Sequence, residues 1–326
     1  YTGGGCPHIL AEPQRTNLIP YSSDFSDSSW IDSGVSITDN NATSPDGTLN
    51  ASTINFSASS QYLLRNQNIT FAIGDSISIS IYANTSTVGF LSFGGATPSG
   101  TDVANVETLS GGFYRHTLTR TFTASGTSVQ FIIWDAAIGN YVIWGGQIEA
   151  GSYATSYIPN FGTALGVTRN QDIFTRDGIG SLINSTEGVL FLEIAALSDD
   201  GTNRYLSIND GTTSNYIYFR FVSTSNTVLM RTVVAGVTIN TLQTAITDTT
   251  DFNKFAFKWK SGDYAFWING VESLVDASAT IFGADVLNTI EFSFPTSGGG
   301  GFPSKVKQLQ VYTTALTDDQ IRQITQ

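Results

Sequence analysis

Side chains that could perform nucleophilic, acid–base or metal chemistry are scarce in this sequence. The 326 residues include one cysteine, Cys6, and two histidines, His8 and His116. Cys6 and His8 lie two positions apart and could both bind a metal ion, but a tetrahedral site needs three or four ligands. Residues 1–16 also contain a triple glycine and no sustained periodicity. We therefore interpret them as an extended N-terminal arm.

Aromatic side chains are better candidates for a functional site. Sugar sites combine ring faces for stacking with amides and arginine for the hydroxyl groups. Trp134 shares strand parity with Gln130 and Ile132. We predict that it faces a partly polar surface alongside Arg115, and both residues are candidate ligand-binding side chains. The alternative, that Trp134 belongs to the core, stays open.

Trp267 is the third candidate ligand-binding residue. It has the opposite parity to Phe266 and Ile268 on a short strand, which makes it a candidate exposed aromatic. Core packing is the alternative for Trp267. Trp144 and Trp259 are interpreted as core residues, since one is flanked by glycines within its strand and the other lies on an apolar strand face.

The composition limits the classes of partner. Charged residues make up 13% of the chain, and 27 acidic against 15 basic residues give a net charge of -12. This charge argues against nucleic acid or an anionic membrane as partner. The apolar runs are far shorter than the roughly 20 residues of a membrane span, and a single cysteine excludes an intrachain disulfide. We expect an extracellular protein and, since the chain begins at Tyr1, a fragment or processed product.

Strand patterns dominate the whole sequence. Residues 75–82, DSISISIY, place isoleucine on one face and serine on the other. Residues 253–260, NKFAFKWK, alternate in the same way, and a Ser-Gly-Asp turn follows them. Near the C-terminus, Thr317 and Gln320 have the spacing of a capping box before a short helix.

These patterns predict an all-β chain made of two antiparallel β-sandwich (jelly-roll) domains in tandem, with a short C-terminal helix. A buried strand, a Gly-Ser turn and a tyrosine-bearing segment that ends at Pro159 mark the end of the first domain. We expect the arm at residues 1–16, the first sandwich at 17–158, a connector at 159–176 and the second sandwich at 177–326.

Two stretches carry a family resemblance. NKFAFKWKSGDYAFWINGV, followed by KVKQLQVYTTALTDDQIRQIT, resembles the laminin-G-like, concanavalin A-like lectin/glucanase sandwich over about residues 172–326. PQRTNLIPYS, SSW and IWGGQIEAGSYATSYIP resemble the carbohydrate-binding-module-like sandwich of phage tail and head-fibre proteins. The second resemblance implies a structural or receptor-binding protein of a virion, or a relative in an integrated prophage.

The first resemblance also raises the question of catalysis, because concanavalin A-like sandwiches include glycanases and polysaccharide lyases. The similar glycanases carry Glu-x-Asp-x-x-Glu on one strand, where two carboxylates lie about 5 Å apart. No such triplet occurs here. Of the three alginate-lyase strands, residues 259–264 echo only one, and both histidines lie outside this domain. We expect no enzymatic activity.

Calcium is the cofactor that the laminin-G-like resemblance suggests. Asp199, Asp200 and Asp210 lie in turn-rich loops and are candidate metal ligands, since calcium prefers oxygen ligands and some laminin-G-like domains bind it. The alternative is that these aspartates form turns.

We therefore expect a non-catalytic structural or adhesion protein of a tail or head fibre, on the virion surface or otherwise extracellular. Its expected partners are a host-surface polysaccharide or glycan and other virion proteins. By analogy with fibres we expect a homo-oligomer, a trimer, although no heptad or collagen repeat supports it. Two alternatives remain: the non-catalytic carbohydrate-binding region of a secreted bacterial polysaccharide-degrading protein, and a purely structural decoration or spacer.

Overall fold

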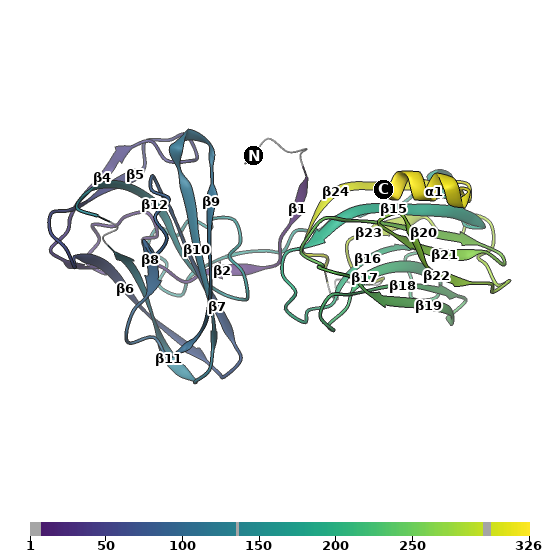
Figure 1. Ribbon diagram of the computed structural model, residues 1–326, viewed down its shortest axis with the longest axis horizontal. Helices are drawn as coiled ribbons and strands as arrows, with labels where there is room; N and C mark the ends of the chain where they lie inside the picture. The colour runs from purple at the N-terminus through teal and green to yellow at the C-terminus, as the bar shows by residue number, and fades with distance from the viewer. Residues whose placement is uncertain (1–7, 135–136, 296–300) are drawn as a thin grey trace. The chain divides into compact units, whose positions relative to one another are not determined.

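The computed structural model describes residues 8–134, 137–295 and 301–326 (Figure 1). The chain divides into two compact units, each with its own core. Unit 1 is Gln14–Asn170, and unit 2 is Gln171–Gln326 together with the described residues up to Pro13. The antiparallel sheets and the short C-terminal α-helix, the only α-helix among these described residues, confirm the predicted all-β fold class.

Unit 1 packs a six-stranded sheet against a four-stranded sheet. Its core lies between them and includes Ile77, Ile79 and Ile81, the apolar face of the alternating stretch. The six-stranded sheet has the order β4 (Ser36–Ala42), β5 (Ala51–Phe56), β12 (Gly139–Ala150), β7 (Ser76–Ala83), β10 (Tyr114–Phe122), β9 (Gly100–Thr108). The four-stranded sheet has the order β3 (Ile31–Ser33), β6 (Tyr62–Phe71), β11 (Gly126–Trp134), β8 (Leu91–Phe93).

Unit 2 consists of two six-stranded sheets around a second core. The first sheet has the order β1 (Ile9–Ala11), β24 (Ser304–Tyr312), β15 (Glu187–Ala196), β20 (Asn253–Lys260), β21 (Tyr264–Ile268), β22 (Val271–Asp276). The second has the order β14 (Thr175–Arg176), β23 (Thr289–Glu291), β16 (Arg204–Asn209), β17 (Tyr216–Phe221), β18 (Thr227–Val234), β19 (Val237–Ala245).

Helix α1 (Asp318–Thr325) begins at the predicted capping box. The Thr317 hydroxyl accepts a hydrogen bond from the Gln320 amide, and the Gln320 side chain accepts one from the Thr317 amide. Both bonds satisfy amides that the first turn of a helix leaves unpaired. Among the described residues no helix is long and apolar enough to cross a membrane.

The described part of the N-terminal arm contributes strands to both units. Strand β1 adds to the edge of β24, with Ile9 opposite Val306. The next residues bond to unit 2 as well, because the Glu12 amide donates to the Asp172 carboxylate at 2.8 Å and the Asp172 amide donates to the Glu12 carbonyl. Strand β2 (Arg15–Asn17) then pairs with β13 (Val167–Arg169) in unit 1. Cys6 lies outside the described residues, and His8 belongs to unit 2, so the expectation that both histidines lie outside the second domain is wrong for His8.

A buried asparagine joins the beginning and the end of unit 1. Asn17 is fully buried, and its Nδ2 donates to the carbonyls of Gly146 (3.2 Å) and Ile158 (2.8 Å). Its Oδ1 accepts from the amides of Ile19 (3.0 Å) and Ile148 (3.3 Å). One side chain thus links β2 to β12 and to the segment after it.

Two further buried side chains of β12 hold that segment. The Gln147 Oε1 accepts from the Ile158 amide at 2.7 Å, and its Nε2 donates to the Thr155 carbonyl at 3.2 Å. The Glu149 carboxylate accepts from both the amide and the hydroxyl of Thr155. We call Asn17, Gln147 and Glu149 the buried clamp. The two sequence motifs that resemble fibre proteins therefore meet in a structural network.

Removal of one clamp member should destabilise unit 1. Asn17→Ala deletes four hydrogen bonds and leaves buried carbonyl and amide groups unpaired, so we expect a loss of about 2–4 kcal/mol in the free energy of unfolding. Urea denaturation measures this loss. Asn68→Ala, an exposed residue of the same unit, is the control and should change stability by less than about 0.5 kcal/mol. Equal unfolding free energies of the two variants would contradict a stabilising role for Asn17.

Unit 1 should also lose stability on mild acidification. His116 is buried with its Nε2 2.7 Å from the Thr85 carbonyl oxygen, and burial lowers its pKa below the ordinary 6.5. The unfolded chain therefore takes up a proton here before the folded chain does, so the unfolding free energy falls as the pH drops below 6.5. Denaturation at about pH 7.5 and about pH 5.5 should show a smaller fall in His116→Gln than in the natural chain. If the unfolding free energy of the variant falls as much as that of the natural chain, groups other than His116 cause the fall.

Candidate functional site

Trp134 lies at the end of β11 in the four-stranded sheet of unit 1. Phe131 and Ile133 on the same strand are fully buried in the core between the sheets. Since side chains alternate along a strand, Gln130, Ile132 and Trp134 lie on the outer face of the sheet. This is the shared face that the strand parity predicts.

The Trp134 ring has a fixed position on this face. It lies opposite Tyr62 of β6, and the two ring centroids are 5.5 Å apart at an interplanar angle of 59°. The indole Nε1 donates to the Ser92 hydroxyl of β8 at 2.7 Å. Both aromatic side chains remain partly exposed. The sheet therefore presents two aromatic rings whose orientations are set before any ligand arrives.

Amide side chains continue the same face along the two strands. Gln130 lies opposite Asn66, and its Nε2 donates to the Asn66 Oδ1 at 2.9 Å. The Gln130 Oε1 accepts from the Ala96 amide at 2.9 Å, which fixes the orientation of the group. Asn66 and Asn68 are exposed, and the Asn66 Nδ2 has no partner among the described residues. Hydrogen-bonding capacity is thus available on the same face, separated from the rings by the buried pair of Leu64 and Ile132.

We call this surface the Trp134 face. It combines two aromatic rings with amides and contains no charged side chain, a composition suited to a neutral, polyhydroxylated ligand. Strand β6 supplies half of it and was not foreseen from the sequence, because three successive buried residues interrupt its alternation. The members of the face are Tyr62, Leu64, Asn66 and Asn68 of β6, and Gln130, Ile132 and Trp134 of β11.

Arg115 does not lie alongside Trp134, and that expectation is corrected. It belongs to β10 in the opposite, six-stranded sheet. Its Nη2 donates to the Thr155 carbonyl and, at 3.2 Å, to the Ser80 hydroxyl, while its guanidinium lies 5.3 Å from the Tyr82 ring centroid. Strand parity assigns a side chain to one face of its own sheet, but it does not reveal which sheet holds the strand.

Trp267 is buried, so its prediction as an exposed aromatic is wrong. Only 1% of its surface is accessible, because α1 covers the outer face of this sheet (Figure 1). Trp267 packs with Ile321 of α1 in a small apolar cluster, and the Arg322 guanidinium lies 5.5 Å from its ring centroid. Parity correctly indicates the face opposite the main core, but a helix distant in sequence fills that face.

The three candidate metal ligands are engaged in local bonds. Asp199 accepts from the Asn226 amide at 3.0 Å, and Asp200 forms an ion pair with Arg204 at 2.8 Å. Asp210 accepts from the amide of the residue two positions ahead, a turn-forming bond. Among the described residues no group of three His, Cys, Asp or Glu side chains is placed to hold a metal ion. The geometry favours the turn-forming alternative over calcium binding.

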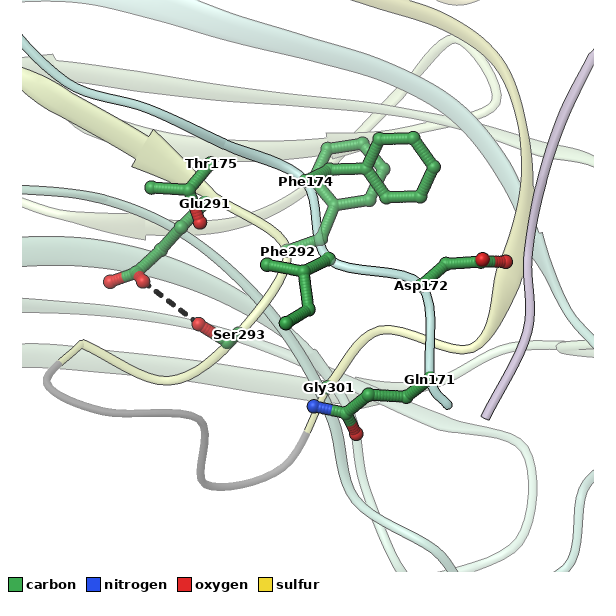
Figure 2. Close-up of a pocket in the computed structure, with 9 residues that line it drawn as sticks. Gln171, Asp172, Phe174, Thr175, Glu291, Phe292, Ser293 and Gly301 are labelled. Atoms are coloured by element: carbon green, nitrogen blue, oxygen red, sulfur yellow. Dashed lines mark hydrogen bonds between the residues drawn. The ribbon is translucent and has the colours of Figure 1, made fainter. Parts of the chain in front are cut away.

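A hollow of about 250 Å³ in unit 2 lies where the segment before β14 meets β23 (Figure 2). The rings of Phe174 and Phe292 lie beside it with centroids 5.1 Å apart. Two carboxylates line it: Glu291 accepts hydrogen bonds from Asn209 at 2.7 Å and Ser293 at 2.9 Å, and Asp172 accepts one from the Glu12 amide at 2.8 Å. Because these polar groups are satisfied within the chain, the hollow offers less to a ligand than the Trp134 face.

No protein-family model matches the chain, and no curated protein matches its sequence. Similar solved structures include a pentraxin of Limulus polyphemus (14% identity, 44% of this chain and 72% of that chain, TM-score 0.36). The binding domain of botulinum neurotoxin serotype G matches at 9% identity over 50% of this chain and 43% of that chain, with a TM-score of 0.38. Sheep galectin-11, solved in complex with glycerol, matches at 12% identity over 43% of this chain and 95% of that chain, with a TM-score of 0.29.

The buried position of Trp267 predicts that its substitution lowers the stability of unit 2. Trp267→Ala opens a cavity under α1, so we expect unit 2 to lose about 3–5 kcal/mol of unfolding free energy. Trp134→Ala should cost unit 1 less, because its ring is partly exposed already. Chemical denaturation of both variants checks the comparison. A Trp267→Ala protein of unchanged stability would contradict the packing under the helix.

Proposed function

We propose that the chain is a non-catalytic adhesion protein of a virion, part of a tail or head fibre, which binds neutral glycans of the host surface through the Trp134 face. The observation that carries this proposal is the placement of the partly exposed Trp134 and Tyr62 rings and of the amides of Asn66 and Gln130 on one sheet face, with the buried pair of Leu64 and Ile132 between them. Pyranose rings present C–H groups that stack on aromatic faces and hydroxyls that bond to amides. The aromatic rings and the amides of this surface can therefore each contact one kind of group on a sugar.

The fixed orientation of these groups favours binding. Ser92 holds the indole of Trp134, and the Ala96 amide holds the side chain of Gln130. Side chains that are already ordered lose little rotamer freedom when a ligand arrives. A shallow face of this kind still gives weak affinity per copy, and several copies in one fibre raise the avidity. This supports a homo-oligomer, for which we propose a trimer.

The place on a virion rests on the two motifs that resemble fibre proteins. These motifs supply the buried clamp, so the resemblance involves residues on which the fold of unit 1 depends. We assign the chain to the virion surface, with other virion proteins as its structural partners.

A glycan array with the full chain tests this function, with and without calcium. Trp134→Ala should weaken binding about tenfold, which corresponds to about 1.4 kcal/mol of lost ring contact. Phe161→Ala removes an exposed aromatic elsewhere in unit 1 and should leave binding unchanged. A blank array with folded protein, or equal binding by Trp134→Ala, would contradict the adhesin function. A structural spacer would then be the better account.

A further inference from the structure

Two arginines lie on the outer face of the second sheet of unit 2. Phe219 and Phe221 of β17 and Met230 of β18 are buried in the core between the sheets. Strand alternation therefore places Arg220 and Arg231 on the opposite, outer face. Both arginines are partly exposed.

The pairing of β17 with β18 makes the two arginines neighbours. Arg220 lies opposite Leu229, and Tyr218 lies opposite Arg231. Arg220 and Arg231 are thus diagonal partners on adjacent strands, a relationship that separates residues by about 7 Å. This spacing refers to the backbone positions; both guanidinium charges also act on one phenol, because Arg231 and Arg220 each oppose the rise that burial causes in the pKa of Tyr218.

Neutral groups hold both side chains. The Arg220 guanidinium lies 5.6 Å from the Tyr205 ring centroid, and its Nη1 donates to the Tyr205 hydroxyl at 3.2 Å. The Arg231 guanidinium lies 5.8 Å from the Tyr218 ring centroid, and its Nε donates to the Thr241 hydroxyl at 3.0 Å. Burial raises the pKa of Tyr218 above its ordinary value, so this phenol stays neutral at physiological pH.

Among the described residues neither arginine has a carboxylate partner, in contrast to several other basic residues of the chain. Arg120 pairs with Asp102 at 2.6 Å, and Lys258 pairs with Asp318 at 2.8 Å. Within the described part of the chain, neither arginine of the β17–β18 pair forms an ion pair. The net charge of -12 shows that acidic residues are abundant. The two adjacent arginines therefore have no ion pair among the described residues, and Glu291, a carboxylate on the same sheet face, accepts its hydrogen bonds from Asn209 and Ser293.

We propose that Arg220 and Arg231 form a second ligand site, which binds the carboxylate of an acidic sugar residue such as a uronic acid. The planar guanidinium fork matches a carboxylate and can donate two parallel hydrogen bonds to it. Thr241 and Gln243 are exposed on the adjacent strand β19, where Gln243 lies opposite Leu229. Their hydroxyl and amide groups are placed to contact the hydroxyls of the same sugar.

The site differs from the Trp134 face in the ligand that it selects. The Trp134 face has no charge and suits neutral sugars, whereas the two arginines require an anionic group. The overall negative charge of the chain opposes long, densely charged polyanions. The arginine site therefore favours glycans in which single carboxylates are separated by neutral sugars, or short acidic oligosaccharides.

Isothermal titration of the full chain with a galacturonic acid tetramer tests the proposal, beside the methyl-esterified tetramer and a sulfated galactose tetramer. We expect the free acid to bind more tightly than the sulfate, and any binding of the neutral ester to be unaffected by substitution of the arginines. Arg220→Gln and Arg231→Gln should each reduce affinity at least about tenfold, as expected for a lost charge-assisted hydrogen bond. Arg176→Gln, an exposed arginine of β14, is the matched control and should leave affinity unchanged.

Three results would overturn the site: no binding of the acid, equal or tighter binding of the sulfate, or unchanged affinity in both glutamine variants. Thermal melting confirms that each variant is folded. If Arg231→Gln fails to fold, Arg231→Lys retains the charge without the fork and should bind more weakly than the natural chain. Trp134→Ala should leave binding of the acid intact, so failure at one site is distinguishable from failure at the other.

Discussion

The buried clamp is the constraint on which unit 1 depends. A buried amide or carboxylate without a partner costs about 1–3 kcal/mol or more, so a group such as Asn17 is stable only when all its neighbours are in place. Asn17 bonds β12 itself and the segment after it, while Gln147 and Glu149 bond the same segment. The network therefore holds β12 between β5 and β7 within the larger sheet.

The Trp134 face follows from that fixed sandwich. Once the two sheets are packed, the burial of Phe131 and Ile133 leaves the alternate side chains of β11 no position except the outer face. Ser92 and Tyr62, from the two neighbouring strands, then restrain the Trp134 ring. A binding surface on paired strands is more rigid than one on loops, and a weak stacking contact benefits most from this rigidity.

Local patterns in the sequence were sufficient for much of this fold. Period-two alternation locates the strands and their buried faces, and the Thr317 capping box locates the helix, because both depend on residues close in the chain. Which element packs against each strand face depends instead on residues distant in the sequence. Arg115 lies on a different sheet from Trp134, and α1 covers Trp267. The residues next to Arg115 and Trp267 in the sequence do not indicate these distant neighbours.

The arginine pair shows how an acidic protein can still select an anion. Specificity is a difference between affinities, and repulsion of the wrong ligand contributes as much as attraction of the right one. Because the net charge is -12, the protein as a whole repels each additional negative charge on a glycan. Arg220 and Arg231 attract one negative charge at their own position. Salt screens the long-range repulsion more than the close contact. Added salt should therefore narrow the preference for sparsely charged over densely charged glycans.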